Sequence, residues 1–520
     1  MIKNGQKWNL KYMFYLKHLA KLFIGISLGI SLFMIFSCDK QDDVEFNLIY
    51  SGLFPDSDTV NYIFPPHKYK ITLNFQPDII YYYTIDGNEP SEESGILYEP
   101  ETGILLDAGN YNVKVALYHN GILADSVASN RYIICSADVI NLIMTNEQEQ
   151  LVYDSRGVRV EINDPYAEFE YRGKKYVLDK LSTRGESTLD YRRKSFSVHL
   201  DEQVQIENRE YSGSFHSLKD FKLVSMVHDY TYIENRIAMG LLQKLNLWNL
   251  FYKYVEVRIN NHTLGVYMLI EDPEDYAIDK LGSEYILRRG YQGTIYKYEY
   301  KPSIYLIPND EYVKAFNNIY SYITLYDNDA MFDSLASIMN INNYFRKMAV
   351  DYLLKNGDLT DEIYFYSQVS DHKIYYQIIP WDYDDIFADN PHEVGRDWGM
   401  GKLFGVRSYQ SVEDIKNDVG DRLIFSIEDD LDYIIAKDDY LYSRYKSILE
   451  EVINNLDNND IESIFSSLKK ELKPFYNNSQ IIEQSAYDRD PASYELYLQN
   501  YSDKLDFIIQ RRAEIVSKLN

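Results

Sequence analysis

The chain has only two cysteines among its 520 residues, Cys38 and Cys135, so at most one internal disulfide bond can form. The fold must therefore be stabilised mainly by a buried apolar core. Basic residues are also scarce, because 53 Lys and Arg stand against 80 Asp and Glu, a formal charge of −27. A surface of this sign repels phosphate backbones and anionic lipid headgroups, which excludes a nucleic-acid-binding protein.

The sequence also has no internal repeat and no low-complexity tract. Its hydrophobic fraction of 45% and its charged fraction of 26% are ordinary for a globular protein, which excludes wholesale disorder. The length predicts two or three domains at roughly 150 residues each. Tyrosine is abundant, with 51 residues, and favours half-buried strands and amphipathic surfaces.

The first 37 residues predict an export signal. They contain five lysines and no acidic residue, and they end in an apolar run at 22–36. Such a run is short for a membrane span and suits the central part of a signal peptide. Without this segment the remaining 483 residues carry a charge of −32. An uncleaved membrane anchor is the alternative, and it gives the same topology, with most of the chain outside the cytoplasm.

The signal ends in Ile35-Phe36-Ser37-Cys38, which resembles the lipobox of bacterial lipoproteins. The resemblance implies that Cys38 is lipidated and holds the protein on a membrane. Asp39-Lys40-Gln41-Asp42-Asp43 resembles the surface-export signal of bacteroidete-type lipoproteins, which implies the outer membrane and cell surface of a Gram-negative cell. Residues 38–55 would be a tether. Cys135 lies in an apolar run and is expected to be a small buried residue.

Residues 56–135 predict an antiparallel β-sandwich. Short alternating segments are separated by turn sequences that contain Gly, Asn, Asp and Pro. The strands are expected at 70–75, 79–85, 111–118 and 131–135. The sequence from Tyr82 to Pro90, followed by that from Ile96 to Pro100, resembles the Ig-like module at the C-terminus of chitobiases and β-hexosaminidases. That resemblance implies a spacer, or a module that contacts protein or glycan, and no catalysis.

From residue 136 onward the pattern changes to α+β. Strands are expected at 158–162, 196–200, 254–259 and 265–270, and a helix at 232–247. Past residue 310 the apolar residues follow helical spacing. One stripe runs from Phe345 to Leu353 and another from Leu441 to Leu456.

Three clusters in this part could carry chemistry. The first is Arg184-Gly185-Glu186-Ser187-Thr188, followed by Arg192-Arg193-Lys194. A glycine allows close approach of backbone to a phosphate, hydroxyl and N–H groups donate hydrogen bonds to it, and cations neutralise it. A basic edge strand would show the same pattern.

The second cluster places Asp358, Asp361 and Glu362 on a loop between the helix at 345–353 and a strand at 363–366. Three carboxylates in five residues can hold a divalent cation or act as a base. A solvated acidic loop is the alternative interpretation.

The third cluster runs from Ile378 to Phe387 and encloses Asp382, Asp384 and Asp385 among apolar residues. Buried charge needs a partner, and this run contains no Lys or Arg. A bound cation is the most economical partner. A turn at the end of a strand is the alternative.

Taken in order, these clusters resemble the CotH family of atypical, secreted protein kinases. The family pattern has a Gly-containing Arg loop, a basic strand, a helix start, a strand pair, a catalytic-loop Asp and a W-D-x-D motif. The matching segments here are 184–188, 193–196, 229–235, 260–271, 356–358 and 380–384. Residues 136–520 would form this kinase-like domain, with two lobes and a helical C-terminal region.

The resemblance implies transfer of phosphate from ATP to protein hydroxyls, with Mg²⁺ or Mn²⁺ as the cation. The residue roles that it implies are as follows. Lys194 contacts the phosphates, with Lys222 as the competing lysine, and Arg184 and Gly185 lie in the loop over the phosphates. Asp358 orients the acceptor hydroxyl; Asp382, Asp384 and Glu362 hold the metal; and Glu271 ends a strand where the chain crosses between lobes.

Three departures from the family pattern leave the activity open. Glu186 replaces an Asn in the phosphate loop, and Glu234 replaces an Arg at the helix start, so both add negative charge near phosphates. Asp361 and Glu362 replace metal-binding Asn residues, and a carboxylate can substitute for an amide as a Mg²⁺ ligand.

Three functions therefore compete. The first is an active surface-anchored kinase that acts on a protein substrate. The second is an inactive pseudokinase that binds a partner in surface adhesion or assembly. The third is glycan binding through the β-module and the aromatic surface.

Overall fold

The structure is a computed structural model of the whole chain. It describes residues 45–49, 61–64, 68–73, 76–107, 109–123, 128–134, 137–185, 187–209, 214–301, 307–370, 372–396, 399–478, 481–482 and 493–520. The predicted signal segment, the lipidation site Cys38, Cys135 and Glu186 lie outside these residues. The chain divides into two compact units, and the second begins at Cys135 apart from a short segment at 62–66.

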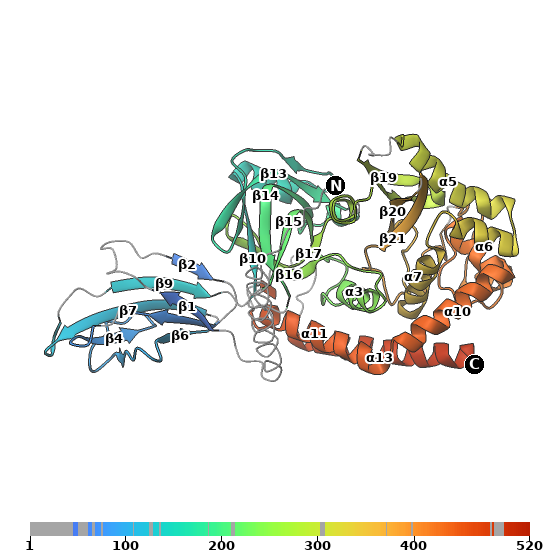
Figure 1. Cartoon of the computed structure of the whole chain (residues 1–520). Coiled ribbons are helices and arrows are strands. Elements are labelled where there is room, and N and C mark those ends of the chain that lie inside the picture. The colour runs from blue at the N-terminus through green and yellow to red at the C-terminus, as the bar shows by residue number, and fades with distance from the viewer. Residues whose placement is uncertain are drawn as a thin grey trace, which may run out of the picture. The chain divides into compact units, whose positions relative to one another are not determined.

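The first unit contains only strands among its described residues, in two sheets (Figure 1). One sheet has the order β1-β3-β6. Within the expected tether, residues 45–49 form β1, which pairs parallel with β3, whereas only antiparallel pairing was expected. The other sheet contains β9-β7-β4-β5, with β8 beside β7. The bounds are β1 Glu45–Ile49, β3 Lys68–Thr72, β4 Ile80–Thr84, β5 Ile96–Leu97, β6 Ile104–Leu106, β7 Gly109–His119, β8 Ile122–Leu123 and β9 Ala128–Ile134; β2, Asn61–Phe64, belongs mostly to the short segment of the second unit.

The turn after β4 has the geometry that its sequence predicts. The Asp86 carboxylate accepts a hydrogen bond from the backbone N–H of Asn88 at 3.0 Å. Gly87 has φ of +87°, a conformation that most side chains disfavour.

The second unit starts with a large sheet of strands in the order β11-β13-β12-β10-β16-β17-β15-β14. A further pairing of β13 with β14 closes this sheet on itself. The pair β10–β16 is parallel and the other pairs are antiparallel. The bounds are β10 Val139–Ile143, β11 Glu161–Ile162, β12 Glu168–Tyr171, β13 Lys174–Arg184, β14 Ser195–Glu207, β15 Phe215–Val224, β16 Tyr252–Ile259 and β17 His262–Glu271.

The interior of this closed sheet is apolar. Side chains such as Phe169, Phe196, Val198, Phe221 and Tyr267 are fully buried there, because alternate residues of each strand point to the same face. Phe169 and Phe221 pack edge to face with ring centroids 5.5 Å apart. The sheet is therefore a rigid support for the residues at its ends.

Short helices accompany the closed sheet. Their bounds are α2 Asn146–Asp154, η1 Ser187–Asp190, α3 Glu234–Lys244, α4 Pro273–Asp275, η2 Tyr276–Lys280 and η3 Tyr291–Gly293. The helix expected at 232–247 is confirmed as α3, and Ile237, Leu241 and Leu242 are buried.

The rest of the second unit is a four-stranded antiparallel sheet, β19-β18-β20-β21, covered by helices (Figure 1). The strands are β18 Tyr285–Arg289, β19 Ile295–Tyr300, β20 Ile363–Ser370 and β21 Lys373–Pro380. The helices are α5 Asn309–Leu325, α6 Asn328–Ala336, α7 Ile341–Leu354, α8 Val412–Val419, α9 Asp430–Lys437, α10 Asp439–Asn455, α11 Asn458–Tyr476 and α13 Tyr494–Leu519. This helical part and the closed sheet are called the helical lobe and the sheet lobe below.

The two predicted apolar stripes lie in helices of the helical lobe. Phe345, Met348 and Leu353 of α7 are buried, as are Leu441 and Leu449 of α10. Phe345 contacts Tyr445 of α10 with ring centroids 6.0 Å apart. The observed mixture of sheets and helices confirms the α+β class.

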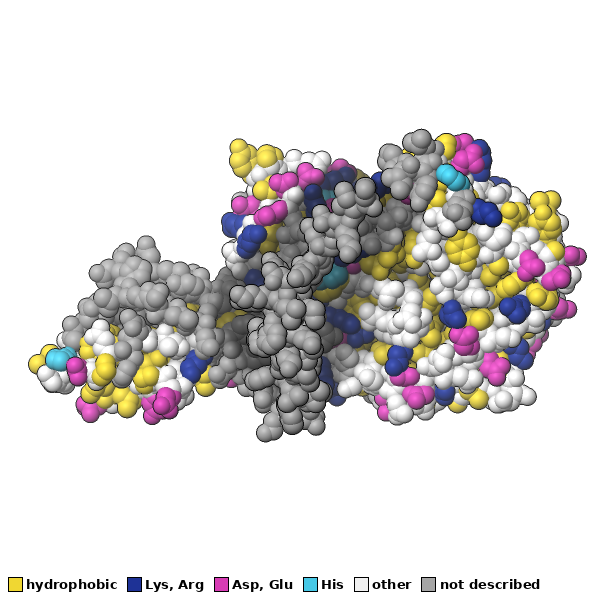
Figure 2. Space-filling model, viewed as in Figure 1, with side chains coloured by type: hydrophobic (Ala, Val, Ile, Leu, Met, Phe, Trp, Pro, Cys, Tyr) yellow, Lys and Arg dark blue, Asp and Glu magenta, His cyan; other side chains and the backbone are white. Residues whose placement is uncertain are grey.

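The described helices include none that is long and apolar enough to span a bilayer. On the face in Figure 2, Asp and Glu side chains are dispersed among basic and polar ones and form no continuous acidic patch. The excess negative charge is thus spread over the described surface on this side.

Candidate functional site

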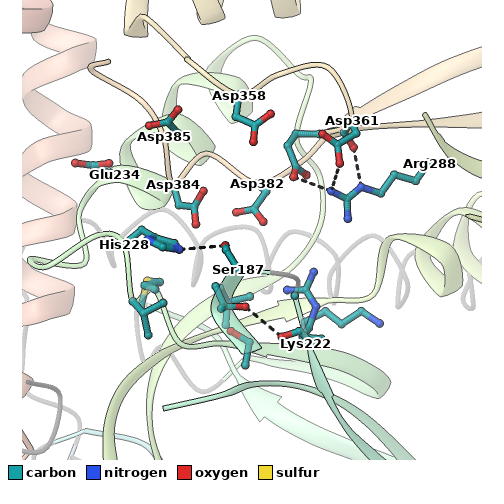
Figure 3. Close-up of a pocket in the computed structure, with 18 of the residues that line it drawn as sticks. Ser187, Lys222, His228, Glu234, Arg288, Asp358, Asp361, Asp382, Asp384 and Asp385 are labelled. Atoms are coloured by element: carbon teal, nitrogen blue, oxygen red, sulfur yellow. Dashed lines mark hydrogen bonds and ion pairs between the residues drawn. The ribbon is translucent and has the colours of Figure 1, made fainter. Parts of the chain in front are cut away.

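A large pocket of about 1300 Å³ lies in the second unit. The sheet lobe contributes residues from the ends of β13, β14 and β15, and the helical lobe contributes the loops that follow α7 and β21. In Figure 3 the carboxylates of Asp358, Asp382 and Asp384 face the same space as Ser187 and Lys222. The first, second and third sequence clusters therefore meet in one place.

Both lobes place charged side chains in this pocket, and most of its carboxylates come from the helical lobe. Basic residues Arg159, Arg184 and Lys222 come from the sheet lobe, and Arg288, Lys297 and Arg396 come from the helical lobe. The helical lobe provides six carboxylates: Asp358, Asp361, Glu362, Asp382, Asp384 and Asp385. An anion beside the basic groups and a cation beside the carboxylates would each find groups of opposite charge.

The loop after β13 would allow a ligand to approach its backbone closely, because it contains Gly185. Gly185 has φ of +98°, and an added Cβ would lie 1.8 Å from the Thr188 Oγ1. The Thr188 hydroxyl donates to the carbonyl of Arg184 at 3.2 Å, which holds this tight turn. The Arg184 guanidinium lies 5.8 Å from the centre of the Trp381 ring, so the loop reaches across to the opposite side of the pocket.

Gly185→Ala is expected to destabilise the protein and to distort this loop. Positive φ costs a non-glycine residue about 1 kcal/mol, and the collision with Thr188 adds to that cost. Gly173→Ala is the matched control, because Gly173 has φ of +74° with no atom near its Cβ position. Chemical denaturation of both variants should show a larger loss of stability for Gly185→Ala. Equal losses would show that Thr188 moves aside without cost.

Two lysines line the pocket, Lys222 from the sheet lobe and Lys297 from β19, and Lys222 is the one named from the sequence. It lies on β15 opposite Ile270 of β17, and its ammonium group pairs with the Asp272 carboxylate just beyond β17. Both side chains are almost fully buried. Burial alone would raise the pKa of Asp272, but the charge of Lys222 and nearby hydrogen bonds outweigh it and hold this pKa well below its usual range.

Two residues named from the sequence do not lie in the pocket. Lys194 is completely buried, and its ammonium group donates to the carbonyl of Leu189. The Glu271 carboxylate lies outside the pocket, where it pairs with Lys280 and lies 3.4 Å from the His216 Nε2. Lys194 and Glu271 thus lie outside the pocket, and Lys222, the competing lysine, lines it.

The segment after β21 carries Asp382 and Asp384 into the pocket. Trp381 is buried, stacks on Trp248 at 6.1 Å, and donates its backbone N–H to the carbonyl of Glu362 at 3.0 Å. The next residue, Asp382, has φ of +42°, which turns the chain sharply. The backbone N–H of Tyr383 donates to the Asn235 side chain of α3 at 2.9 Å. Both ends of the Asp382 turn are therefore fixed.

The surroundings of Asp384 disfavour its ionisation. The pKa of Asp384 is raised well above its usual value, first by burial and then by the charges of Asp382 and Asp358. Crowding of like charges of this kind is relieved when a cation binds between them. Asp382 and Asp384 thus suit a hard divalent cation.

Glu362 lies on the same side, but it already has a partner. Its Oε1 accepts from the Arg288 guanidinium of β18 at 2.7 Å, and Arg288 also lies 3.3 Å from the Asp361 carboxylate. Its Oε2 is buried without a hydrogen-bond partner among the described residues. Burial raises the pKa of Glu362 well above its usual value, and Asp382 adds to the rise although Arg288 opposes it. One oxygen thus remains available for a cation, so the donor set fits Mg²⁺ or Mn²⁺.

Asp358 lies at the start of the loop after α7. The helix ends at Leu354, and Lys355 adopts a left-handed conformation with φ of +52°. The backbone N–H of Gly357 then donates to the carbonyl of Asp385 at 2.8 Å, which joins the Asp358 loop to the Asp382–Asp385 segment. Asp358 thereby lies in the pocket with 34% of its side chain exposed.

A buried ionic network supports this loop from behind. Arg289 is completely buried, donates to the carbonyl of Thr360 at 2.6 Å, and lies 3.4 Å from Asp429 and 3.6 Å from Asp432. Its Nη1 also donates to the Tyr344 hydroxyl at 2.6 Å. The network fixes Thr360 between the pocket residues Asp358 and Glu362.

The C-terminal helix α13 also contacts a pocket residue. Lys504 lies 3.3 Å from the Glu234 carboxylate and 4.0 Å from the centre of the Phe387 ring, and both of these residues line the pocket. Burial and the neighbouring Asp229 raise the pKa of Glu234 to about 8, while Lys504 opposes the rise. The Glu234 carboxyl group, which departs from the expected family pattern, thus has a cation beside it.

Several pocket residues escaped the sequence analysis. Arg288, His228, His392 and Arg396 line the pocket, and Lys504 contacts it. They come from segments far apart in the chain and belong to no short motif. Only their charge, in a chain poor in basic residues, could have suggested them.

A family model described as CotH kinase protein matches residues 181–515. No curated protein matches the chain. Among solved structures, a match is a complex described as the Shewanella oneidensis MR-1 toxin–antitoxin system HipA, HipB and its operator DNA. It is 12% identical, with 76% of this chain and 76% of that chain covered, and its TM-score of 0.28 is too low to establish a shared fold.

Proposed function

The chain belongs to the CotH kinase protein family, and we propose that its second unit binds ATP with a divalent cation and transfers the terminal phosphoryl group to a protein hydroxyl. The observation that supports this most strongly is that basic side chains and a group of carboxylates line the same pocket. Cations on the sheet lobe face carboxylates on the helical lobe, as ATP bound to a metal requires.

The roles follow from position. Lys222 and Arg184 would neutralise the phosphates, and Gly185 would let backbone N–H groups approach them. Asp382, Asp384 and the available oxygen of Glu362 would hold Mg²⁺ or Mn²⁺, which supplies further charge neutralisation. Asp358 would orient the acceptor hydroxyl and take its proton. The acceptor oxygen then forms a bond to the terminal phosphorus while the bond to the departing diphosphate breaks.

One observation favours an inactive pseudokinase as the second candidate. Arg288 occupies one oxygen of Glu362, and Asp272 occupies Lys222, so two of the groups needed for ATP and metal are engaged in ion pairs. An inactive protein of this kind would act through partner binding.

The proposal also covers where the protein is located and what its first unit does. We propose a lipoprotein anchored through Cys38 at the cell surface, with the β-rich unit at 56–135 as an Ig-like spacer. The sequence at Ile35–Cys38 supports the anchor, and the Tyr82–Pro90 turn supports the module. Glycan binding through the aromatic surface ranks below protein phosphorylation, because no described feature favours it.

Thermal denaturation with ATP tests the active candidate. ATP with Mg²⁺ at 100 times its dissociation constant is expected to stabilise the wild type by about 2.7 kcal/mol, and ATP with EDTA to stabilise it far less. Lys222→Met combined with Asp272→Asn avoids an unpaired buried Asp272 and should lose this effect. Asp358→Asn should keep the ATP effect and lose transfer of labelled phosphate.

Two results would contradict the proposal. An unchanged melting temperature of the wild type with ATP and Mg²⁺ would favour the pseudokinase, and undiminished transfer by Asp358→Asn would remove Asp358 from its role. Lys314→Met is the matched control for the lysine change, because Lys314 is exposed on α5.

A further inference from the structure

His392 lies beside Asp358 although the two are distant in sequence. The backbone N–H of His392 donates to the carbonyl of Gly357 at 3.1 Å, which fixes it next to the Asp358 loop. Its Nδ1 lies 3.7 Å from the Asp358 Oδ1 and 3.7 Å from the Glu428 Oε1. The imidazole ring is thus placed between two carboxylates.

The two carboxylates differ in how firmly they are held. Glu428 is 5% exposed, and its Oε2 accepts from the Thr360 hydroxyl at 2.7 Å. Its neighbour Asp429 belongs to the buried network around Arg289. Glu428 is therefore a fixed anchor, whereas Asp358 extends into the pocket.

We propose that His392 is the positioning residue of Asp358: held by the buried Glu428, its imidazolium orients the Asp358 carboxylate and keeps it ionised for the acceptor hydroxyl. The chemical purpose rests on the proposed function. The charge state and the contacts are properties of the protein without any ligand, so they can be tested separately.

The surroundings explain why an adjacent cation matters. The charge of Asp358 is disfavoured by three nearby carboxylates, those of Asp361, Asp385 and Glu428. The charge of Asp358 in turn disfavours ionisation of the Tyr291 hydroxyl. Arg396 is a further cation near the pair, and its charge opposes the protonation of His392. Burial, and then these acids, raise the pKa of Asp358 to about 6, although the charge of His392 lowers it.

The imidazole is stabilised in its charged form. Burial lowers the pKa of His392, but the adjacent Glu428 and Asp358 carboxylates outweigh burial and raise it above the usual value. Between the pKa of Asp358, about 6, and the raised pKa of His392, the pair is therefore a carboxylate and an imidazolium. Loss of the imidazolium would raise the pKa of Asp358 further, so the pH below which Asp358 becomes protonated would rise.

Histidine NMR on the ligand-free full chain tests the arrangement without any kinase assay. The chain has nine histidines, and His392→Gln identifies the signal that belongs to His392. We expect the wild-type signal to titrate above pH 6.5, and Asp358→Asn and Glu428→Gln each to lower that pKa by about one unit. A His392 that titrates at or below pH 6.5, or that neither substitution affects, would overturn the proposal.

The pH profile of phosphate transfer provides a second measurement. His392→Gln should move the acidic limb of the profile upward by about one pH unit, with little change in stabilisation by ATP and Mg²⁺. His262→Gln is the matched control, because its side chain is 78% exposed on β17 away from the pocket. An acidic limb that stays in place would contradict the role of His392. If neither the wild type nor any variant transfers phosphate, the proposed function fails. The NMR titration still shows whether His392 interacts with Asp358 and Glu428.

Discussion

Asp384→Asn is expected to raise the melting temperature of the ligand-free protein and to remove its stabilisation by ATP and Mg²⁺. Burial and the nearby Asp382 and Asp358 raise the pKa of Asp384 well above its usual value. An acid of this kind stabilises the folded state most when it is protonated, and that contribution is lost as the pH rises through its folded-state pKa. The amide removes the unfavourable charge, so the variant should melt higher at neutral pH.

The same change removes a metal carboxylate. Phosphate transfer should therefore fall on the order of 10³-fold, and ATP with Mg²⁺ should no longer shift the melting temperature. Each kcal/mol by which the substitution increases the unfolding free energy of the ligand-free protein should raise its melting temperature by about 2–4 °C.

Thermal scans between pH 5 and pH 8, with and without ATP and Mg²⁺, measure both effects. The ligand-free wild type should lose stability relative to Asp384→Asn as the pH increases across this range. Asp421→Asn makes the same chemical change at a side chain that is 82% exposed, and it should change neither quantity. A lower melting temperature for ligand-free Asp384→Asn would mean that the carboxylate is favourably bound, and retained stabilisation by ATP and Mg²⁺ would exclude it as a metal ligand.

Arg289→Leu is expected to cost about 3–5 kcal/mol of stability. It leaves Asp429 and Asp432 buried without their cation, and it removes the hydrogen bonds to Thr360 and Tyr344. Because Thr360 lies between Asp358 and Glu362, binding of ATP and Mg²⁺ should weaken as well.

A triple variant separates the two causes of that loss. Adding Asp429→Asn and Asp432→Asn to Arg289→Leu neutralises the stranded acids and should recover a large part of the stability, because Asn also caps the N-terminus of α9. Lys314→Ala is the control for an exposed ion pair and should change stability by less than about 1 kcal/mol. Urea denaturation provides the measurement. An Arg289→Leu protein within about 1 kcal/mol of the wild type would show that the network contributes little.

The secondary structure was predictable wherever one face of an element is buried. The apolar spacing in α3, α7 and α10 predicts the helices, because burial against a neighbour selects a 3.6-residue period. The segment at 158–162 shows the limit of this approach. Only Glu161 and Ile162 form β11 there, since this strand lies at an edge and pairs only with β13.

The choice between Lys194 and Lys222 could not be made from sequence. Residues of a strand alternate between faces, and Ser195 and Ser197 of β14 line the pocket, so Lys194 is out of phase with them. Lys222 is the partner of Ser197 across the β14–β15 pair and therefore shares its face. The alternation defines two faces, but only the closure of the sheet decides which one meets the helical lobe.

The carboxylates of the site were predictable, and their partners were not. Asp358, Asp382 and Asp384 occur in short motifs that follow an element directly. Arg288, by contrast, reaches the pocket from β18, and Glu428 lies behind it in the segment before α9. Such long-range pairings depend on how the elements pack, which the local sequence does not encode.

Because the chain is synthesised from its N-terminus, the contact between α13 and Glu234 forms late. Every pocket element up to Arg396 emerges from the ribosome before Lys504, because α13 follows them all in the chain. At about 5–20 residues per second, the roughly 110 intervening residues delay Lys504 by several seconds. During that interval Glu234 and Asp229 lack this cation, and Phe387 lacks its contact with Phe507. A nascent chain would thus carry an incomplete pocket until its last helix docks, which would limit nucleotide capture before the protein is whole.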